Sequence, residues 1–388
     1  MQSKQLSLAL SLWLTLCVGS ATQAGQAGRI ESMKLLTPEV GWAATNKKLF
    51  WTTDGGAQWK DITPKINHKE QHISSVFFLN SSTGLVLFSC NDARDPMADD
   101  VCFEFASTNN SGQHWSIVHP KIVDPVPPSV ITEDGQGFSH TTFLEFVDAQ
   151  HGWAILKRNL HVEASSGVML RTVDGGKTWT QLPNDTLPVA GPFHFATAEV
   201  GWVAGGGQPE SDLYVTHDAG ETWSQVAVNP PAAVKVEDWP PAENGVWPDY
   251  RLPFFESPGR GFLIGSYWDG SKPTSVVFST TDLGRTWKFE RVLPGIDGVL
   301  TISGETLLAV STPPSMDSLT LKRLPLIGKV TPPVTVTAHT GGIQLKHYNL
   351  GAGYDTLTMV DDTHGWLLAD ELRKTTNGGL TWTDITPW

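Results

Sequence analysis

The chain has 388 residues and a formal net charge of −13, with 27 Lys and Arg against 40 Asp and Glu. This balance argues against a nucleic-acid partner, because nucleic-acid-binding proteins need a basic surface that displaces counterions. Only 17% of the residues are charged, and 37 Gly and 26 Pro interrupt the chain, which excludes a helical bundle or coiled coil. A hydrophobic content of 40% excludes a disordered chain.

The first 24 residues have the pattern of a secretory signal peptide. Lys4 supplies a positive charge, residues 6–16 form an apolar run, and Thr22-Gln23-Ala24 is a suitable cleavage site. The run is shorter than the roughly 20 residues that cross a bilayer, and no later stretch is long enough. We therefore expect an exported mature chain, residues 25–388, that is periplasmic or secreted and has no transmembrane segment.

Two cysteines remain after removal of the signal. Cys90 and Cys102 bracket an acidic insert, and in an oxidising compartment such a pair is expected to form a disulfide. Because the loop is short, the disulfide stabilises the fold by about 3 kcal/mol at most. No Cys-x-x-Cys motif is present, so we interpret the pair as a loop staple and not as a redox centre.

A motif of the form Thr-x-Asp/Asn-x-Gly-x-x-Trp occurs six times, which indicates a repeat-built protein. A second motif precedes each copy, with an apolar residue followed six positions later by Gly and another apolar residue, as at Phe146 and Gly152-Trp153. The acidic or amide residues of the six copies are Asp54, Asn110, Asp174, Asp218, Asp282 and Asn377, and the closing tryptophans are Trp59, Trp115, Trp179, Trp223, Trp287 and Trp382.

Between these landmarks the chain consists of short strand-like runs. In the second unit we expect strands over residues 73–78, 84–89, 103–108 and 114–118, which make a four-stranded antiparallel meander. The interval between Asp282 and Asn377 spans almost two repeats, so residues 295–345 should contain a unit without the motif. We predict one all-β domain, a seven-bladed β-propeller of four-stranded antiparallel blades, whose innermost strands come first in each blade. Strand exchange between the chain ends is not evident.

Thr172-Val-Asp174-Gly-Gly176-Lys-Thr-Trp179 following Gly152-Trp153 resembles the Asp-box, or sialidase-type, repeat. The version here is most similar to that of the photosystem II stability/assembly factor family, and the likeness covers six of the seven predicted units. It implies an exported, non-enzymatic propeller that binds a membrane-protein intermediate. Asp boxes also occur in sialidases, sortilin-type receptors and xyloglucan-degrading enzymes, so the resemblance defines the fold better than the function.

A structural role for the motif is favoured over a catalytic one. An Asp or Asn that opens a hairpin accepts turn amides, the Gly two positions on tolerates positive φ, and the Trp anchors the returning strand between blades. Asn110 and Asn377 fit a hydrogen-bond acceptor and not a general acid. The Gly-Trp motif is interpreted as a turn followed by a core anchor.

Variation in length indicates which end of the propeller binds. The first-to-second and third-to-fourth strand turns are nearly constant and should share one end, whereas the inserts fall at the opposite end, where binding loops are expected. The inserts are Asn91–Val101, Lys157–Gly167, Gly205–Asp212, Tyr267–Ser275, His119–Thr141 and Val226–Phe254. Aromatic residues beside charged ones favour recognition, which gives as candidates Trp239, Trp247, Asp249, Tyr250, Arg251, Tyr267, Trp268, Asp269, Arg158 and Arg94. Packing of these tryptophans onto the rim is the equally supported alternative.

An enzymatic function is less well supported. A sialidase requires three arginines, a Tyr nucleophile with a Glu partner and an acid/base Asp. Arg94, Arg158 and Arg251 could converge, but no Glu partner is evident among five Tyr. We expect no catalytic residue, cofactor or metal, and a monomer with a protein partner, such as a membrane-protein complex. A sialidase-like glycosidase and a carbohydrate-binding propeller remain alternatives.

Overall fold

The computed structural model describes residues 29–388 with gaps. The segments outside the description are 67–70, 92–100, 122–137, 159–166, 184–186, 206–211, 227, 229–248, 258, 269–272, 295–298, 304, 312–317, 328–333, 340–356 and 369–370. The expected signal peptide lies outside the described residues. In the part of the chain that is described, no helix is long and apolar enough to cross a membrane.

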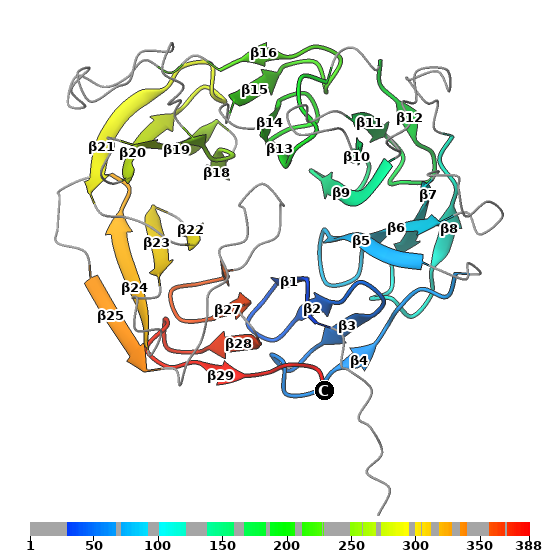
Figure 1. The fold of residues 1–388 in the computed structure, drawn as a ribbon, viewed down its shortest axis with the longest axis horizontal. Coiled ribbons are helices and arrows are strands. Elements are labelled where there is room, and N and C mark those ends of the chain that lie inside the picture. The colour runs from blue at the N-terminus through cyan, green and yellow to red at the C-terminus, as the bar shows by residue number, and fades with distance from the viewer. Residues whose placement is uncertain are drawn as a thin grey trace, which may run out of the picture.

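Within the described residues, the strands form seven antiparallel sheets that stand around a central axis (Figure 1). Sheet 1 contains β1 (Ser32–Leu35), β2 (Gly41–Ala44), β3 (Leu49–Thr52) and β4 (Lys60–Asp61). Sheet 2 contains β5 (Gln71–Phe78), β6 (Gly84–Asn91), β7 (Val101–Thr108) and β8 (Ser116–Val118). Sheet 3 contains β9 (Phe138–Phe146), β10 (Gly152–Arg158), β11 (Gly167–Thr172) and β12 (Thr180–Gln181). Sheet 4 contains β13 (Phe193–Phe195), β14 (Gly201–Gly205), β15 (Asp212–Thr216) and β16 (Ser224–Gln225).

The remaining sheets include one departure from the four-strand pattern. In sheet 5, β17 (Asp249–Tyr250) and β18 (Phe254–Ser257) both pair with β19 (Arg260–Trp268), so the innermost strand is interrupted. This sheet continues with β20 (Pro273–Thr280) and β21 (Lys288–Pro294). Sheet 6 contains β22 (Val299–Ser303), β23 (Thr306–Ser311), β24 (Ser318–Pro325) and β25 (Val334–His339), and sheet 7 contains β26 (Leu357–Met359), β27 (Gly365–Leu368), β28 (Leu372–Thr375) and β29 (Thr383–Asp384).

The chain is an all-β propeller, because its cores lie between neighbouring sheets. One cluster joins sheets 1 and 2 through Trp42, Trp51 and Phe88, and another joins sheets 2 and 3, where the rings of Phe105 and Trp179 stack with centroids 4.2 Å apart. Each sheet therefore buries both of its faces against its neighbours, which a single meander cannot do alone.

The repeated Gly of the second motif serves close packing, which corrects its interpretation as a turn residue. Gly152 and Gly201 are the first residues of their strands and pair with Phe146 and Phe195 of the innermost strand. A Cβ atom at either glycine would meet the partner's ring at 2.5 Å. The six-residue spacing of the motif therefore places an aromatic ring directly across a glycine.

The Thr-x-Asp/Asn turns all make the same hydrogen bonds. In the six copies, the Thr hydroxyl donates to the Asp or Asn Oδ1 at 2.7–3.1 Å and accepts the amide of the motif Gly at 2.8–3.0 Å. The amide four residues after the Asp or Asn donates to the same Oδ1 at 2.8–3.0 Å. Each Asp or Asn thus acts as an acceptor that closes its own turn.

Six backbone hydrogen bonds show that the two constant turn classes share one end of the ring. In six sheets an amide of the Thr-x-Asp/Asn turn donates to the first-to-second strand turn, as in Gly55 N to Glu39 O at 2.7 Å and Gly378 N to Thr363 O at 2.8 Å. We call this end the turn face. The opposite end, where the second-to-third strand connections and the sheet-to-sheet connections lie, is the insert face.

The ring closes without strand exchange among the described strands. Ile385 after the last strand packs beneath Gly56 of sheet 1, and its carbonyl accepts Trp59 Nε1 at 2.7 Å. At the contact between sheets 1 and 2, Ile62 packs beneath Gly112 and accepts Trp115 Nε1 at 2.9 Å. Both isoleucines belong to an Asp-Ile-Thr-Pro segment, residues 61–64 and 384–387. The contact between sheets 7 and 1 therefore has the same form as the contact between sheets 1 and 2.

Candidate functional site

The candidates in the fifth sheet lie at the insert face. Asp249 and Tyr250 pair with Ser266 and Gly265 of β19, and the same strand ends at Trp268 opposite Pro273. Strand β19 runs toward the insert face, because its start at Arg260 adjoins the turn in which Leu283 N contacts Gly259 O. The fold thus brings the backbones of Asp249, Tyr250, Arg251, Tyr267 and Trp268 to one end of one sheet.

Tyr250 does not serve as an exposed contact residue. Its side chain is 9% exposed and belongs to the core between sheets 4 and 5, beside Leu263 and Val276. A strand of two residues carries too little alternation for the sequence to reveal which side chain faces inward. Arg251 is half-buried, and its amide donates to Ile264 O at 3.0 Å.

The remaining candidates are placed only in part. Arg158 ends β10 opposite Phe138, at the insert face of sheet 3. Cys90 and Cys102 are direct cross-strand partners on β6 and β7, a position in which Cα atoms lie about 4.5–5.5 Å apart, within the range of disulfides; the bond itself remains a prediction. Trp239, Trp247, Asp269 and Arg94 lie outside the described residues.

Charged side chains line the described part of the insert face near the axis. Arg29 and Glu31 precede β1, and His72 lies near the start of β5. Burial raises the pKa of Glu31, while the charges of Arg29 and His72 partly offset that effect. Lys47 and Lys48 are exposed in the neighbouring turn, where Lys48 pairs with Asp61 at 3.2 Å. The described part of this face therefore carries charges of both signs.

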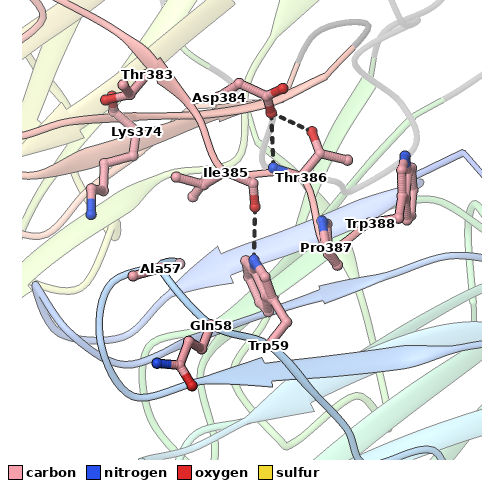
Figure 2. Close-up of a pocket in the computed structure, with 11 residues that line it drawn as sticks. Ala57, Gln58, Trp59, Lys374, Thr383, Asp384, Ile385, Thr386, Pro387 and Trp388 are labelled. Atoms are coloured by element: carbon pink, nitrogen blue, oxygen red, sulfur yellow. Dashed lines mark hydrogen bonds between the residues drawn. The ribbon is translucent and has the colours of Figure 1, made fainter.

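A shallow pocket of about 520 Å³ lies on the outside of the contact between sheets 7 and 1 (Figure 2). Its wall includes Trp59, Lys374 and the segment Thr383–Trp388. Lys374 Nζ donates to Gly55 O at 2.8 Å, and Asp384 Oδ1 accepts the amide and hydroxyl of Thr386 at 2.8 and 2.6 Å. Lys374 thus links sheet 7 to sheet 1, whereas the hydrogen bonds between Asp384 and Thr386 are local to the last segment of the chain.

Six residues at equivalent positions of the inner strands, which we call the axial level, were not singled out by sequence reasoning. Each of its residues precedes the apolar residue of the second motif and pairs with the residue after the motif Gly. The level consists of Lys34, Phe77, Glu145, His194, Phe254 and Thr358. The signal was available in the sequence, because all six lie seven residues before the repeated Gly.

His194 and Glu145 form an ion pair within this axial level. His194 Nδ1 lies 2.7 Å from Glu145 Oε1, and Glu145 Oε2 accepts the Phe195 amide at 3.1 Å. Burial lowers the pKa of His194, but the adjacent Glu145 carboxylate outweighs burial and raises it, while the charge of Lys34 acts in the opposite direction. The side chains are 30% and 21% exposed, so solvent reaches both.

No group of three or more His, Cys, Asp and Glu side chains among the described residues could hold a metal ion. The convergence of Arg94, Arg158 and Arg251 expected of a sialidase is not described, since Arg94 and the Arg158 side chain fall outside the description.

Comparison with family models and with curated proteins finds no match. Among solved structures, the chain is similar to "YCF48 bound to D1 peptide", with a TM-score of 0.49 and 14% identity over 90% of this chain and 93% of that chain. It is also similar to the polysaccharide lyase Uly1, with a TM-score of 0.47 and 10% identity over 91% and 90% of the two chains. A sialidase from Trypanosoma rangeli has a TM-score of 0.39 and 11% identity, over 84% of this chain and 55% of that chain. At these identities no function is transferred.

Proposed function

We propose that this chain is an exported, non-enzymatic seven-bladed Asp-box propeller that binds a protein partner through its insert face. The observation behind this proposal is the set of six hydrogen bonds between the constant turns, because these bonds give the turn face the same local structure in six sheets. The connections of variable length are left at the opposite end. Variable loops on a rigid scaffold are the usual location of binding sites.

The charge and side-chain composition of the insert face support a protein surface as the ligand. Arg29, Glu31 and Lys47 provide charges of both signs at this face, and the backbones of Trp268 and Arg251 come to the same end of the fifth sheet. Mixed charges with aromatic and Arg side chains are typical of protein recognition. Periplasmic or secreted location, the signal peptide, the monomeric state and a membrane-protein complex as the partner belong to the same proposal.

A pair of photocrosslinking variants tests the face. Lys47 on the insert face and Lys177 on the turn face are both exposed, so a photoreactive amino acid at either position samples solvent to a comparable extent. We expect position 47 to crosslink a discrete protein in the native host and position 177 to yield none. Equal yields from both positions, or crosslinks from position 177 alone, would refute the assignment of the face.

A second variant links the contact to the named side chains. Trp268→Ala with Arg251→Ala should reduce the yield from position 47, whereas Lys177→Ala should leave it unchanged. A circular dichroism spectrum and melting temperature of each variant control for folding. An unchanged yield in the folded double variant would remove these residues from the binding site.

A further inference from the structure

Asn377 and Gly378 form an Asn-Gly pair inside the last copy of the Thr-x-Asp/Asn turn. The sequence contains one other such pair, Asn244-Gly245, which lies outside the described residues. Asparagine loses its side-chain amide most readily before glycine, because glycine has no side chain to hinder attack by its own backbone nitrogen. Of the six copies of the motif, the last is the one that combines this asparagine with this glycine.

Loss of the amide proceeds through a cyclic imide. The backbone nitrogen of Gly378 forms a bond to Cγ of Asn377 and the Cγ–Nδ2 bond breaks. Nδ2 leaves as ammonia and takes with it the proton that the Gly378 nitrogen gives up. A water molecule then opens the imide at either carbonyl, which yields aspartate in the normal linkage or isoaspartate, in which the backbone runs through the side chain.

The folded turn holds both reacting groups in other hydrogen bonds. The amide of Gly378 donates to Thr363 O at 2.8 Å, so its proton is engaged. Asn377 Oδ1 accepts the Thr375 hydroxyl at 3.1 Å and the Thr381 amide at 3.0 Å. Asn377 Nδ2 donates to Thr381 Oγ1 at 2.9 Å, which fixes the carboxamide across the turn. Attack by the Gly378 nitrogen therefore requires the turn to open.

Contacts with the neighbouring sheets keep this turn closed. Sheet 7 lies between sheets 6 and 1 in the ring (Figure 1). Arg323 on β24 of sheet 6 donates to Gly378 O at 2.6 Å and to Asp362 O at 2.9 Å, and Gly378 is buried. On the other side, Lys374 of β28 donates to Gly55 O in the turn of sheet 1 at 2.8 Å. The last turn is thus held through its contacts in the ring.

We propose that Asn377 is a deamidation site that the closed ring protects, so that its amide is lost when sheet 7 loosens from sheet 6. Local opening of this kind occurs in folded proteins without global unfolding.

The two products have different consequences for the ring. Aspartate at position 377 preserves the turn, because an aspartate closes the same turn in four other copies, namely Asp54, Asp174, Asp218 and Asp282. Isoaspartate adds a methylene group to the backbone and displaces the oxygen that accepts the Thr381 amide. The modification therefore records earlier opening of sheet 7 and, as isoaspartate, hinders its return.

The first measurement compares Asn377 with itself in the unfolded chain. The protein is incubated at pH 8 in buffer and in guanidinium chloride, and peptide mapping by mass spectrometry quantifies the loss of amide. In guanidinium chloride, Asn377 and Asn244 should convert at comparable rates, since both precede glycine. In buffer, conversion at Asn377 should be roughly a hundredfold slower than in guanidinium chloride, because the turn opens rarely. Equal rates under the two conditions would overturn the protection.

A pair of threonine variants distinguishes opening of this turn from global unfolding. Thr375→Val removes the hydroxyl that bonds to Asn377 Oδ1 at 3.1 Å and to the Gly379 amide at 2.8 Å. Thr108→Val removes the two corresponding bonds in sheet 2, both 3.0 Å long. We expect Thr375→Val to speed conversion at Asn377 about tenfold, the factor for loss of one hydrogen bond, and Thr108→Val to leave it unchanged. Equal acceleration would mean that global unfolding controls the reaction, contrary to the proposal.

A pair of arginine variants tests the role of the ring. Arg323→Met removes the link to sheet 6 but none of the hydrogen bonds made by the Asn377 side chain. Arg171→Met is the matched control, because Arg171 of sheet 3 pairs with Glu221 in the turn of sheet 4 at 3.0 Å. Arg323→Met should speed conversion about tenfold, and Arg171→Met should not.

An unchanged rate in folded Arg323→Met would overturn the control by ring closure. The comparison between buffer and guanidinium chloride needs no variant, so a folding defect in one of them leaves the proposal testable. None of these outcomes depends on the protein partner proposed for the insert face.

Discussion

At the scale of single residues, the Thr-x-Asp/Asn turns impose a left-handed backbone on two successive positions. In three copies the first of these positions is not Gly: Ser111, Ala219 and Leu283 have φ of 58°, 61° and 56°. The second position is always Gly, as at Gly220 with φ of 95°. A left-handed conformation costs about 1–2 kcal/mol for a residue with a Cβ atom. The turns therefore tolerate strain at one position and avoid it at the next.

Ala219→Gly and Gly220→Ala should change stability in opposite directions. We expect Ala219→Gly to raise the free energy of unfolding by roughly 0.5 kcal/mol, because relief of strain exceeds the added flexibility of the unfolded chain. Gly220→Ala should lower it by about 2 kcal/mol, since a Cβ atom there would also approach Leu182 at 2.9 Å and Met169 Sδ at 3.2 Å. Urea denaturation measures both, and a shift of the same sign in the two variants would contradict this account.

At the scale of elements, the repeat spacing made most of the fold predictable. In the second sheet the expected strands over 73–78, 84–89 and 103–108 correspond to Gln71–Phe78, Gly84–Asn91 and Val101–Thr108. A four-stranded sheet, β22–β25, also forms within residues 295–345, where no Thr-x-Asp/Asn motif exists. Periodic turns locate strands well because their hydrogen bonds are local, as those of Thr172 and Asp174 show.

Contacts between sheets were less accessible to sequence reasoning. The burial of Tyr250 depends on packing between sheets 4 and 5, and no local pattern encodes that arrangement. The Asp-Ile-Thr-Pro segments at 61–64 and 384–387 were visible in the sequence, but their meaning required knowing that Ile62 and Ile385 support the next sheet. The axial level was likewise visible as a fixed offset, whereas the pairing of His194 with Glu145 follows from the ring.

The two isoleucines provide a test of how the ring is closed. Ile62→Ala and Ile385→Ala should each lower the free energy of unfolding by about 2–3 kcal/mol, because each removes the packing beneath a motif glycine. Chemical denaturation followed by tryptophan fluorescence gives both values. A large effect of Ile62→Ala beside no effect of Ile385→Ala would mean that the contact between the last and first sheets contributes little to closure.

At the scale of the whole molecule, the aspartates of these turns make the free energy of unfolding depend on pH in the acidic range. Hydrogen bonds from the residue four positions on lower the pKa of Asp54, Asp174 and Asp282. A carboxyl group with a lowered pKa in the folded state stabilises the protein above its unfolded pKa, and this contribution is lost as pH falls below about 4. The asparagines at 110 and 377 make the same turn without titrating.

Replacing the three aspartates by asparagine should therefore flatten the acid limb of the stability profile. We expect the triple variant Asp54→Asn, Asp174→Asn and Asp282→Asn to be no more stable than the unmodified protein at pH 6, and to lose less stability between pH 5 and pH 3. Urea denaturation at each pH provides the measurement. Parallel profiles for the two proteins would show that other carboxyl groups control acid unfolding.

The chemical equivalence of the contacts at Ile62 and Ile385 has a consequence for connectivity. Sheet 7 contacts sheet 1 in the same way as sheet 1 contacts sheet 2. The packing between sheets therefore does not determine between which two sheets the ends of the polypeptide lie. A circularly permuted chain, joined from Trp388 to Arg29 by a linker and opened between β4 and β5, would retain every described contact between sheets. The order of the sheets around the axis is fixed by their surfaces, while the position of the break is free to vary.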